Sequence, residues 1–404
     1  MRKWMVVCGW WLVAISAEAQ EADTTLSWLT RTALDRHPSV RAAAYAAAGA
    51  RERAAAAGAL ADPEFMLGVN VSARSASALG RASAGLRQTL PWPGTRQAGR
   101  DAAHAAAAAR GHARDVARVA VVRDLHTAWH ARHKQARQAE LLHDNQAWLA
   151  RLEALARQRL AAGAASRADL LRLEMEREEL ASMIRRLDFE SAATDALIRR
   201  LAGLAPDEPF TPPSGPVRDL AFEPVSDMAH PMVAESEAMA EESERMARLT
   251  ALETRPMMGL GVELMGPSAL GMGGETMLIP SVSVSLPIWR SANRSRIAAA
   301  ETSVMAARET ASAIRLDLDS EREEAGTRYR DASDRVELYR SRLLPRSIEL
   351  ADLVLAAFSS GQATSEDVIR ARRETLDLQL RLAEAQTDRI RAVILLQSLY
   401  PDLP

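Results

Sequence analysis

The chain has 404 residues, of which 48% are hydrophobic and 26% are charged, and its formal net charge is −2. Aromatic residues make up only 4% and alanine is abundant, a mix that favours long helices packed through small side chains over an aromatic-rich globular core. The nearly balanced charge gives no support for nucleic acid as a partner, which would require a clustered basic surface. The length allows two domains or one large elongated domain.

Residues 1–19 have the features of a secretion signal. Arg2 and Lys3 form a short positive region, residues 5–15 are apolar, and Ala17-Glu18-Ala19 places small residues where a signal peptidase reads them. We therefore expect an exported protein.

The single cysteine, Cys8, lies inside this apolar run. Lipidation of Cys8 is the alternative to simple cleavage, but Val7 is too large for a good lipidation motif, so we expect cleavage before Gln20. The mature chain would then lack disulfides, thiolate metal sites and a cysteine nucleophile. No later stretch is apolar long enough for a membrane-spanning helix, so an exported chain that crosses a membrane would do so with strands.

An internal repeat is the most informative feature of the sequence. His37-Pro38 opens an alanine-rich helical run, and His230-Pro231 opens another. Further along, the turn segment 161–171 is matched by the segment 359–369. Several such matches in the same order predict an internal two-fold repeat.

The repeat and the prolines between its copies divide the mature chain into three parts. We expect a first repeat over 20–205, a proline-rich linker over 206–226 and a second repeat over 227–404.

Each repeat is predicted to contain a helix, two strands, a long helix, a turn and a final helix. The expected helices span 39–62, 95–160, 166–202, 232–254, 290–357 and 365–399. At 1.5 Å per residue the helix over 95–160 would be about 100 Å long, matched by two shorter helices stacked end to end. Pro345 should kink the helix over 290–357.

Apolar residues on these helices keep a spacing typical of coiled coils. They are Leu141, Trp148, Leu152 and Leu155 in the first repeat, and Ile369, Leu376, Leu380, Ala383 and Ile390 in the second. A tube that crosses a periplasm needs helices of this length, whereas a globular domain does not.

The predicted strands alternate apolar with small or polar residues, as in Phe65, Leu67 and Val69 or in Leu260, Val262 and Leu264. Period-two segments of this kind are the weak signature of a transmembrane β-barrel, and an ordinary half-buried hairpin is the alternative. A closed β-barrel needs about eight strands or more. The four strands of one chain would therefore have to combine with the strands of other copies. Three copies would give a twelve-stranded barrel.

With these features the sequence resembles the TolC-like outer-membrane efflux family over essentially the whole mature chain. The resemblance is carried by the His-Pro openings, by the repeated G-x-x-[ST]-x-x-D-[LV]-[LI] turn, and by Leu90-Pro91-Trp92-Pro93-Gly94 between strand and long helix. It implies an α+β membrane protein and a homotrimer, with a shared barrel in outer-membrane lipid and a tunnel of antiparallel coiled-coil helices in the periplasm. It also implies two partners: a periplasmic adaptor and an inner-membrane pump, which we expect to be of the RND type.

The junctions between strand and helix carry the finer part of the resemblance. They comprise Pro91, Trp92, Pro93 and Gly94 in the first repeat, with Pro287 and Trp289 in the second. The prolines end strand hydrogen bonding and the glycine allows the change of backbone direction. The first of these turns resembles that of the branch serving heavy-metal pumps.

Two turns at the expected periplasmic tip resemble the adaptor-docking grooves of the family. They contain Gly163 and Ser166 in one repeat and Gly361 and Thr364 in the other. A purely structural role is also open, since glycine supplies a left-handed C-cap and the hydroxyl caps the next helix.

Asp169 and Asp367 follow these turns, one helical turn further on. In the family, acids at this place line the closed aperture, where three copies would form a ring that favours cations. The alternative is favourable charge at a helix N-terminus. Arg370 and Ala363 differ from the residues that relatives have at these positions. Whether the aperture is locked closed at rest therefore stays an open alternative.

Two groups of side chains could bind metal, although we favour a structural role for both. His126, His130 and His133 share one helix face and could chelate a divalent ion. The methionines of the second hairpin could offer thioethers to Cu(I), or could simply fill apolar space. They are Met257, Met258, Met265, Met272 and Met277.

No enzyme motif or cofactor-binding motif is present in the sequence, and the expected function is a passive efflux conduit, for heavy-metal cations in the first place. Drug efflux and type I protein secretion share the same architecture and stay open. The alternative from another class is a periplasmic coiled-coil scaffold or adaptor without a pore.

Overall fold

The computed structural model describes residues 25–70, 81–163, 166–214, 230–268 and 275–400. The predicted signal segment over 1–19 and the linker from residue 215 onward lie outside the described residues. The chain divides into two compact units. The first unit consists of Met1–Ala42, Ala117–His230 and Asp317–Pro404, and the second unit of Ala43–Val116 and Pro231–Leu316.

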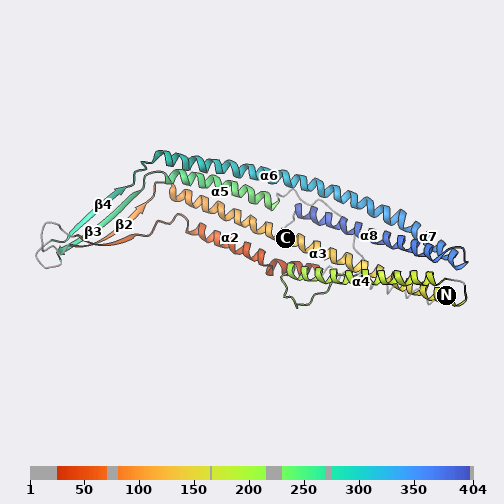
Figure 1. The fold of residues 1–404 in the computed structure, drawn as a ribbon. Helices are drawn as coiled ribbons and strands as arrows, with labels where there is room; N and C mark the ends of the chain where they lie inside the picture. Colours follow the sequence, from red (N-terminus) through yellow and green to blue (C-terminus); the bar gives the residue numbers. More distant parts are fainter. Residues whose placement is uncertain (1–24, 71–80, 164–165, 215–229, 269–274, 401–404) are drawn as a thin grey trace, which may run out of the picture. The chain divides into compact units, whose positions relative to one another are not determined.

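Most predicted helices have the expected bounds (Figure 1). A helical segment over 25–36 comes first. The helices that follow are α2 (Pro38–Ala56), α3 (Thr95–Ala161), α4 (Arg167–Ala202), α5 (Pro231–Glu253), α6 (Arg290–Glu337), α7 (Leu344–Ser359) and α8 (Ser365–Leu399). At 1.5 Å per residue, the 67 residues of α3 span about 100 Å, as predicted.

Helix α2 ends at Ala56 and not at residue 62 as expected. The cause is Gly58, which has a φ of 77° and therefore takes the left-handed conformation that commonly ends a helix. Its carbonyl oxygen accepts a hydrogen bond from Arg96 Nε at 2.7 Å.

The predicted helix over 290–357 is interrupted by a wider turn. Helix α6 ends at Glu337, a π-helical turn spans Leu338–Leu343, and α7 begins at Leu344. The Leu344 N–H donates to the Tyr339 carbonyl, five residues back. Pro345 has no N–H to donate and its ring crowds the preceding turn. The π-helical turn therefore lies where the sequence predicts that Pro345 disturbs the helix.

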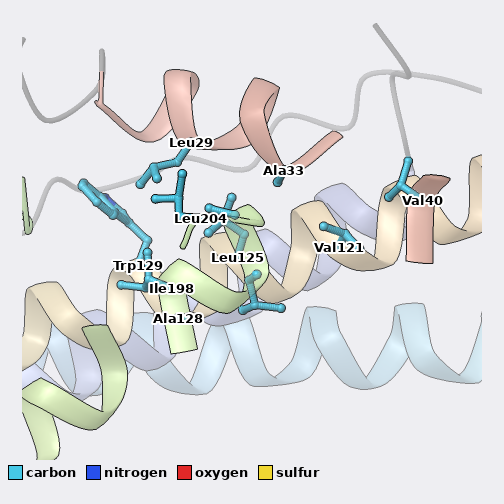
Figure 2. Packing of buried hydrophobic residues seen from close by; sticks show 11 residues of the cluster. Leu29, Ala33, Val40, Val121, Leu125, Ala128, Trp129, Ile198 and Leu204 are labelled. Carbon is cyan, nitrogen blue, oxygen red and sulfur yellow. The ribbon is translucent and has the colours of Figure 1, made fainter. Parts of the chain in front are cut away.

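In the first unit, the segment 25–36 packs on α3 and α4 (Figure 2). Leu29 meets Leu125 and Trp129 of α3 and Ile198 of α4, and all four side chains are buried. Burying each of the large apolar side chains contributes about 1.5–3 kcal/mol.

Two further clusters of the first unit join the helical hairpin α3–α4 to the hairpin α7–α8. One contains Leu149, Leu152 and Leu173 with Phe358 and Val368, and the other contains Leu141, Leu180 and Leu376. Most of the predicted coiled-coil residues are therefore packed. Leu155 is the exception, at 38% exposed.

The second unit contains one antiparallel sheet in the order β1-β2-β3-β4. The strands are β1 (Glu64–Asn70), β2 (Arg81–Leu90), β3 (Met258–Ser268) and β4 (Met277–Val284). The two predicted hairpins are present, and β2 of the first pairs with β3 of the second, as in Leu86 opposite Val262. Strands β1 and β4 are the edges of this sheet.

The strand register separates the side chains onto two different faces. One face, here called the apolar face, carries large hydrophobic residues that are all exposed: Phe65, Leu67, Val69, Leu86, Leu260, Val262, Leu264, Leu278, Val282 and Val284. The opposite face, here called the small-residue face, carries Gly68, Ser83, Gly85, Arg87, Gly259, Gly261, Glu263, Ser281 and Ser283, with the larger apolar residues Met66, Met265, Met277 and Ile279.

Glycine and serine are partners across the small-residue face. Gly261 lies opposite Ser281, and a Cβ at Gly261 would come within 2.6 Å of the Ser281 Oγ. Gly261 therefore has no room for a side chain unless Ser281 moves. None of the helices in the described part of the chain has an apolar stretch long enough to cross a bilayer.

Candidate functional site

The turn between α3 and α4 is built from two caps. Gly163 has a φ of 73°, and its N–H donates to the Leu160 carbonyl at 3.0 Å. Ser166 is the N-cap of α4: its Oγ accepts the Asp169 N–H at 3.2 Å, while the Asp169 carboxylate accepts the Ser166 N–H at 3.1 Å. This reciprocal pair is a capping box.

The turn between α7 and α8 repeats this chemistry. Gly361 has a φ of 81° and donates to the Phe358 carbonyl at 3.0 Å, and the Gln362 N–H reaches the Ala357 carbonyl at 2.9 Å. This pair of bonds is a Schellman motif. Thr364 and Asp367 form the second capping box. The capping role that the sequence predicts for both turns is therefore confirmed.

Both glycines leave open space around them. A Cβ added at Gly163 or at Gly361 would meet no atom within 4 Å. Only their positive φ restricts substitution, so these two positions are an accessible surface of the turns as well as caps.

The two aspartates differ in one contact. Asp169 Oδ1 accepts a hydrogen bond from the Ser365 Oγ at 2.5 Å, which ties the start of α4 to the start of α8. Ser365 is buried, and Arg172 lies 3.5 Å from the same carboxylate. Asp367 has no such link among the hydrogen bonds of the described residues, and its carboxylate accepts from Thr364 N at 3.0 Å and Thr364 Oγ1 at 2.7 Å.

Hydrogen bonds favour the ionised form of both carboxyl groups. Donation from the Ser166 and Ser365 side chains lowers the pKa of Asp169, and donation from the Thr364 side chain lowers the pKa of Asp367. The structure thus places both predicted aperture residues in capping boxes at the turns. Their role at an aperture stays a prediction.

Charged and aromatic contacts hold the two hairpins together near the turns. Arg159 donates to the Phe358 carbonyl at 2.9 Å, and its guanidinium lies 4.6 Å from the centre of the Phe358 ring. Arg373 of α8 binds Glu176 and Glu179 of α4. These contacts position the two turns beside each other.

Glu153 is a buried carboxylate that sequence reasoning missed. Its side chain is only 3% exposed, it accepts from Arg177 at 3.1 Å, and it also contacts Arg157. The four-residue spacing of Glu153 and Arg157 is a detectable signal, but the contact with Arg177 joins two helices whose register the sequence does not show. Ser365 was missed because its bond to Asp169 joins two turns that lie far apart in the sequence.

The strand-to-helix junctions form tight turns in the second unit. After β2, the Thr95 N–H donates to the Trp92 carbonyl at 3.1 Å across Pro93 and Gly94, and Gly94 has a φ of 91°. Proline followed by a residue with positive φ is the pattern of a type II turn. This supports the predicted use of Pro91, Pro93 and Gly94 in redirecting the chain.

The second junction uses a different geometry. Two successive three-residue turns follow β4, with Ile288 donating to the Leu286 carbonyl and Arg290 to the Ile288 carbonyl, both at 2.9 Å. Pro287 and Trp289 are the central residues of these turns, and Trp289 is 74% exposed.

The three histidines of α3 have structural surroundings. His126 Nε2 lies 3.1 Å from Thr30 Oγ1, and His133 is buried. Burial, followed by the neighbouring His126 and His133, lowers the pKa of His130 to about 4. Across the described residues, no group of three or more His, Cys, Asp or Glu side chains could hold a metal ion. The histidine metal site is therefore not supported.

No protein-family model matches this chain, and no curated protein matches it. Solved structures do match. VceC, an outer-membrane protein of Vibrio cholerae, is 16% identical with a TM-score of 0.78, over 93% of this chain and 96% of VceC. CusC, described as forming a transmembrane channel, is 16% identical with a TM-score of 0.80, over 93% of this chain and 92% of CusC.

The same fold is found in MtrE of Neisseria gonorrhoeae, an outer-membrane channel whose open state is known. MtrE is 16% identical with a TM-score of 0.75, over 93% of this chain and 88% of MtrE. At these identities the likeness establishes the fold over nearly the whole length of each chain.

Proposed function

We propose that this chain, which has the fold of the TolC-like outer-membrane channels, is the channel component of a tripartite efflux system. It would be a passive exit duct and catalyse no reaction. An inner-membrane pump would deliver the substrate through a periplasmic adaptor.

The observation that carries this proposal is the exposed apolar face of the sheet. Leu67 is 76% exposed and Val282 is 72% exposed, although both belong to a contiguous set of large hydrophobic side chains. A soluble protein rarely leaves such a surface open to water. Contact with outer-membrane lipid accounts for it.

The sheet edges support assembly of several copies. Strands β1 and β4 each have a pairing partner on one side only within the sheet, and unpaired backbone groups in lipid cost several kcal/mol each. Three copies would pair these edges and close a twelve-stranded barrel around the small-residue face. The homotrimer and the location in the outer membrane follow from this step.

The internal two-fold repeat, over 20–205 and 227–404, is part of the same proposal. Its support is that each half contributes one strand hairpin and one capping box of the same construction. The accessible turns at Gly163 and Gly361, with Ser166 and Thr364, would be the docking points for the adaptor.

The proposal also extends to the class of substrate that the channel carries. We propose efflux of heavy-metal cations by an RND-type pump, on the strength of the Leu90-Pro91-Trp92-Pro93-Gly94 turn. Drug efflux and type I protein secretion are the alternatives. A periplasmic scaffold without a pore is the alternative from another class, and the exposed apolar face disfavours it.

The test is to express the full 404-residue chain and to separate the membranes. The protein should float with outer membranes and migrate as a heat-labile trimer in mild detergent. A monodisperse soluble monomer from the periplasm would exclude the barrel. Co-expression with candidate pumps and adaptors of the metal, drug and protein-secretion types, followed by growth on metal salts and on drugs, then decides the substrate class.

A further inference from the structure

Two methionines of the second hairpin face each other across the sheet. Met265 of β3 and Met277 of β4 are direct register partners on the small-residue face. Directly opposed residues in an antiparallel pair have Cβ atoms about 4.5–5.5 Å apart, so both thioether sulfurs can reach one point between the strands. Met258, by contrast, belongs by register to the apolar face, opposite Val284.

The surroundings of this pair do not fit the role of apolar filler. Met277 is 49% exposed, and Met66, on the same face of β1, is 38% exposed. Between them, β2 presents Ser83 and Gly85 to this face, and β1 adds Gly68 beside Ser83. A flexible side chain used as filler would be enclosed by other apolar groups. On this face the pair has Ile279 as an apolar neighbour, but Met265 also borders Ser83 of β2 and Glu263 of its own strand.

A carboxylate lies next to the pair. Glu263 precedes Met265 by two residues on the same face of β3, and its register partner is Ile279, two residues from Met277 on β4. Glu263 is thus adjacent to Met265 along its strand and diagonal to Met277. The Glu263 carboxylate can attract a cation without being needed as a ligand, although Arg87 of β2 lies on the same face in the position diagonal to Glu263 and offsets part of its charge.

We propose that Met265 and Met277 form a binding site for a soft monovalent cation, Cu(I) or Ag(I). Thioethers select such ions over Zn²⁺ and other harder cations. Binding requires no deprotonation and no change of oxidation state, because the thioether sulfur donates a lone pair. The site rests on the proposed function in one respect: the small-residue face lines the channel only if the sheet closes into a barrel.

Two neutral ligands suit a site on a conduction path. Conduction requires binding that is favourable enough for entry and weak enough for release. Two thioethers with a nearby carboxylate meet this requirement better than a closed cage of thiolates would.

The experiment uses the purified full-length protein in detergent, with its methionine methyl groups labelled with ¹³C, and Ag(I) alone as the probe. Titration should shift the methyl resonances of Met265 and Met277, while that of Met258 stays in place. The shift should be lost in M265L/M277L and kept in the matched control M258L, and Zn²⁺ should cause no shift. E263Q should weaken Ag(I) binding without abolishing the shift.

Unmoved Met265 and Met277 resonances would overturn the proposal, and so would equal Ag(I) binding by M265L/M277L and M258L. Leucine keeps apolar volume, and trimer migration of each variant shows whether it is folded. The proposed function is judged separately on the same preparation by membrane location and oligomeric state. If the protein is a trimer in the outer membrane but Ag(I) shifts neither the Met265 nor the Met277 resonance, the metal site is excluded and the proposed function stands.

Discussion

At the scale of single residues, we expect His130 of α3 to make the stability of the protein sensitive to acid. Burial holds the pKa of His130 at about 4, whereas an unfolded chain binds this proton near pH 6.5. Between these values the unfolded state carries the extra proton, so the stability from neutral His130 is complete above pH 6.5 and is lost as the pH falls toward 4. A difference of this size corresponds to about 3 kcal/mol.

His130→Leu should therefore flatten the dependence of unfolding on pH between 6.5 and 4. The measurement is the urea midpoint of the purified protein at several pH values. His143→Gln, at an exposed position of the same helix, is the matched control. It should leave the change of the urea midpoint with pH as it is in the wild type. Equal slopes in the wild type and in His130→Leu would show that His130 does not carry the acid response.

Substitution of the turn glycines Gly163 and Gly361 can distinguish a role in helix capping from a role in adaptor docking. Their positive φ costs an ordinary residue about 1–2 kcal/mol, while nothing within 4 Å opposes an added Cβ. Asparagine tolerates the left-handed conformation, so Gly163→Asn and Gly361→Asn should keep the turns and the trimer. If the adaptor needs the open surface, efflux and adaptor binding should fall in these variants.

The control for this prediction is Gly326→Ala, a helical position where an added Cβ also meets no atom within 4 Å. Alanine there should leave efflux intact and stabilise the protein by about 0.4–1 kcal/mol. Normal efflux by both asparagine variants would mean that the turns serve folding only. Loss of the trimer would mean the same.

At the scale of elements, the two faces of the sheet should respond oppositely to charge. Leu67→Arg places a cation on the apolar face and should cost about 2–4 kcal/mol if that face meets the middle of a bilayer. Ser281→Arg places the same charge on the small-residue face and should be tolerated. The urea concentration that abolishes heat-modifiable trimer migration measures both effects. Equal loss in the two variants would contradict the assignment of faces.

The elements that the sequence predicts well are those with local signals. Helix α8 begins and ends at the expected residues because Thr364 and Asp367 cap it and because its apolar spacing is regular. The alternation in β3 likewise predicts its two faces. These signals depend only on neighbours along the chain.

Features that depend on distant residues could not be predicted. The pairing of β2 with β3 joins the two halves of the sequence, and the bond from Ser365 to Asp169 joins two turns. Nothing local marks either contact. The early end of α2 was readable in principle, since Gly58 is a helix-stop signal, but the alanines around it masked the signal.

At the scale of the whole molecule, the last prediction concerns conduction. Asp169 and Asp367 are ionised at neutral pH, as aspartates ordinarily are, and hydrogen bonds lower the pKa of both further. If three copies assemble with the hairpin turns around one opening, two carboxylates from each copy converge there. Such rings of acidic side chains favour cations and bind multivalent cations.

Channels reconstituted in planar bilayers should then prefer cations, and a multivalent cation such as hexamminecobalt should block them from the side of the helical hairpins. Asp169→Asn with Asp367→Asn keeps an oxygen that can accept the N-cap N–H, yet removes the charge, so selectivity and block should both weaken. Glu366→Gln removes a charge from the same turn and is the matched control, because Glu366 is exposed and paired with Arg370 at 3.0 Å. Unchanged selectivity and block in the double variant would restrict both aspartates to helix capping and would place the constriction at other residues.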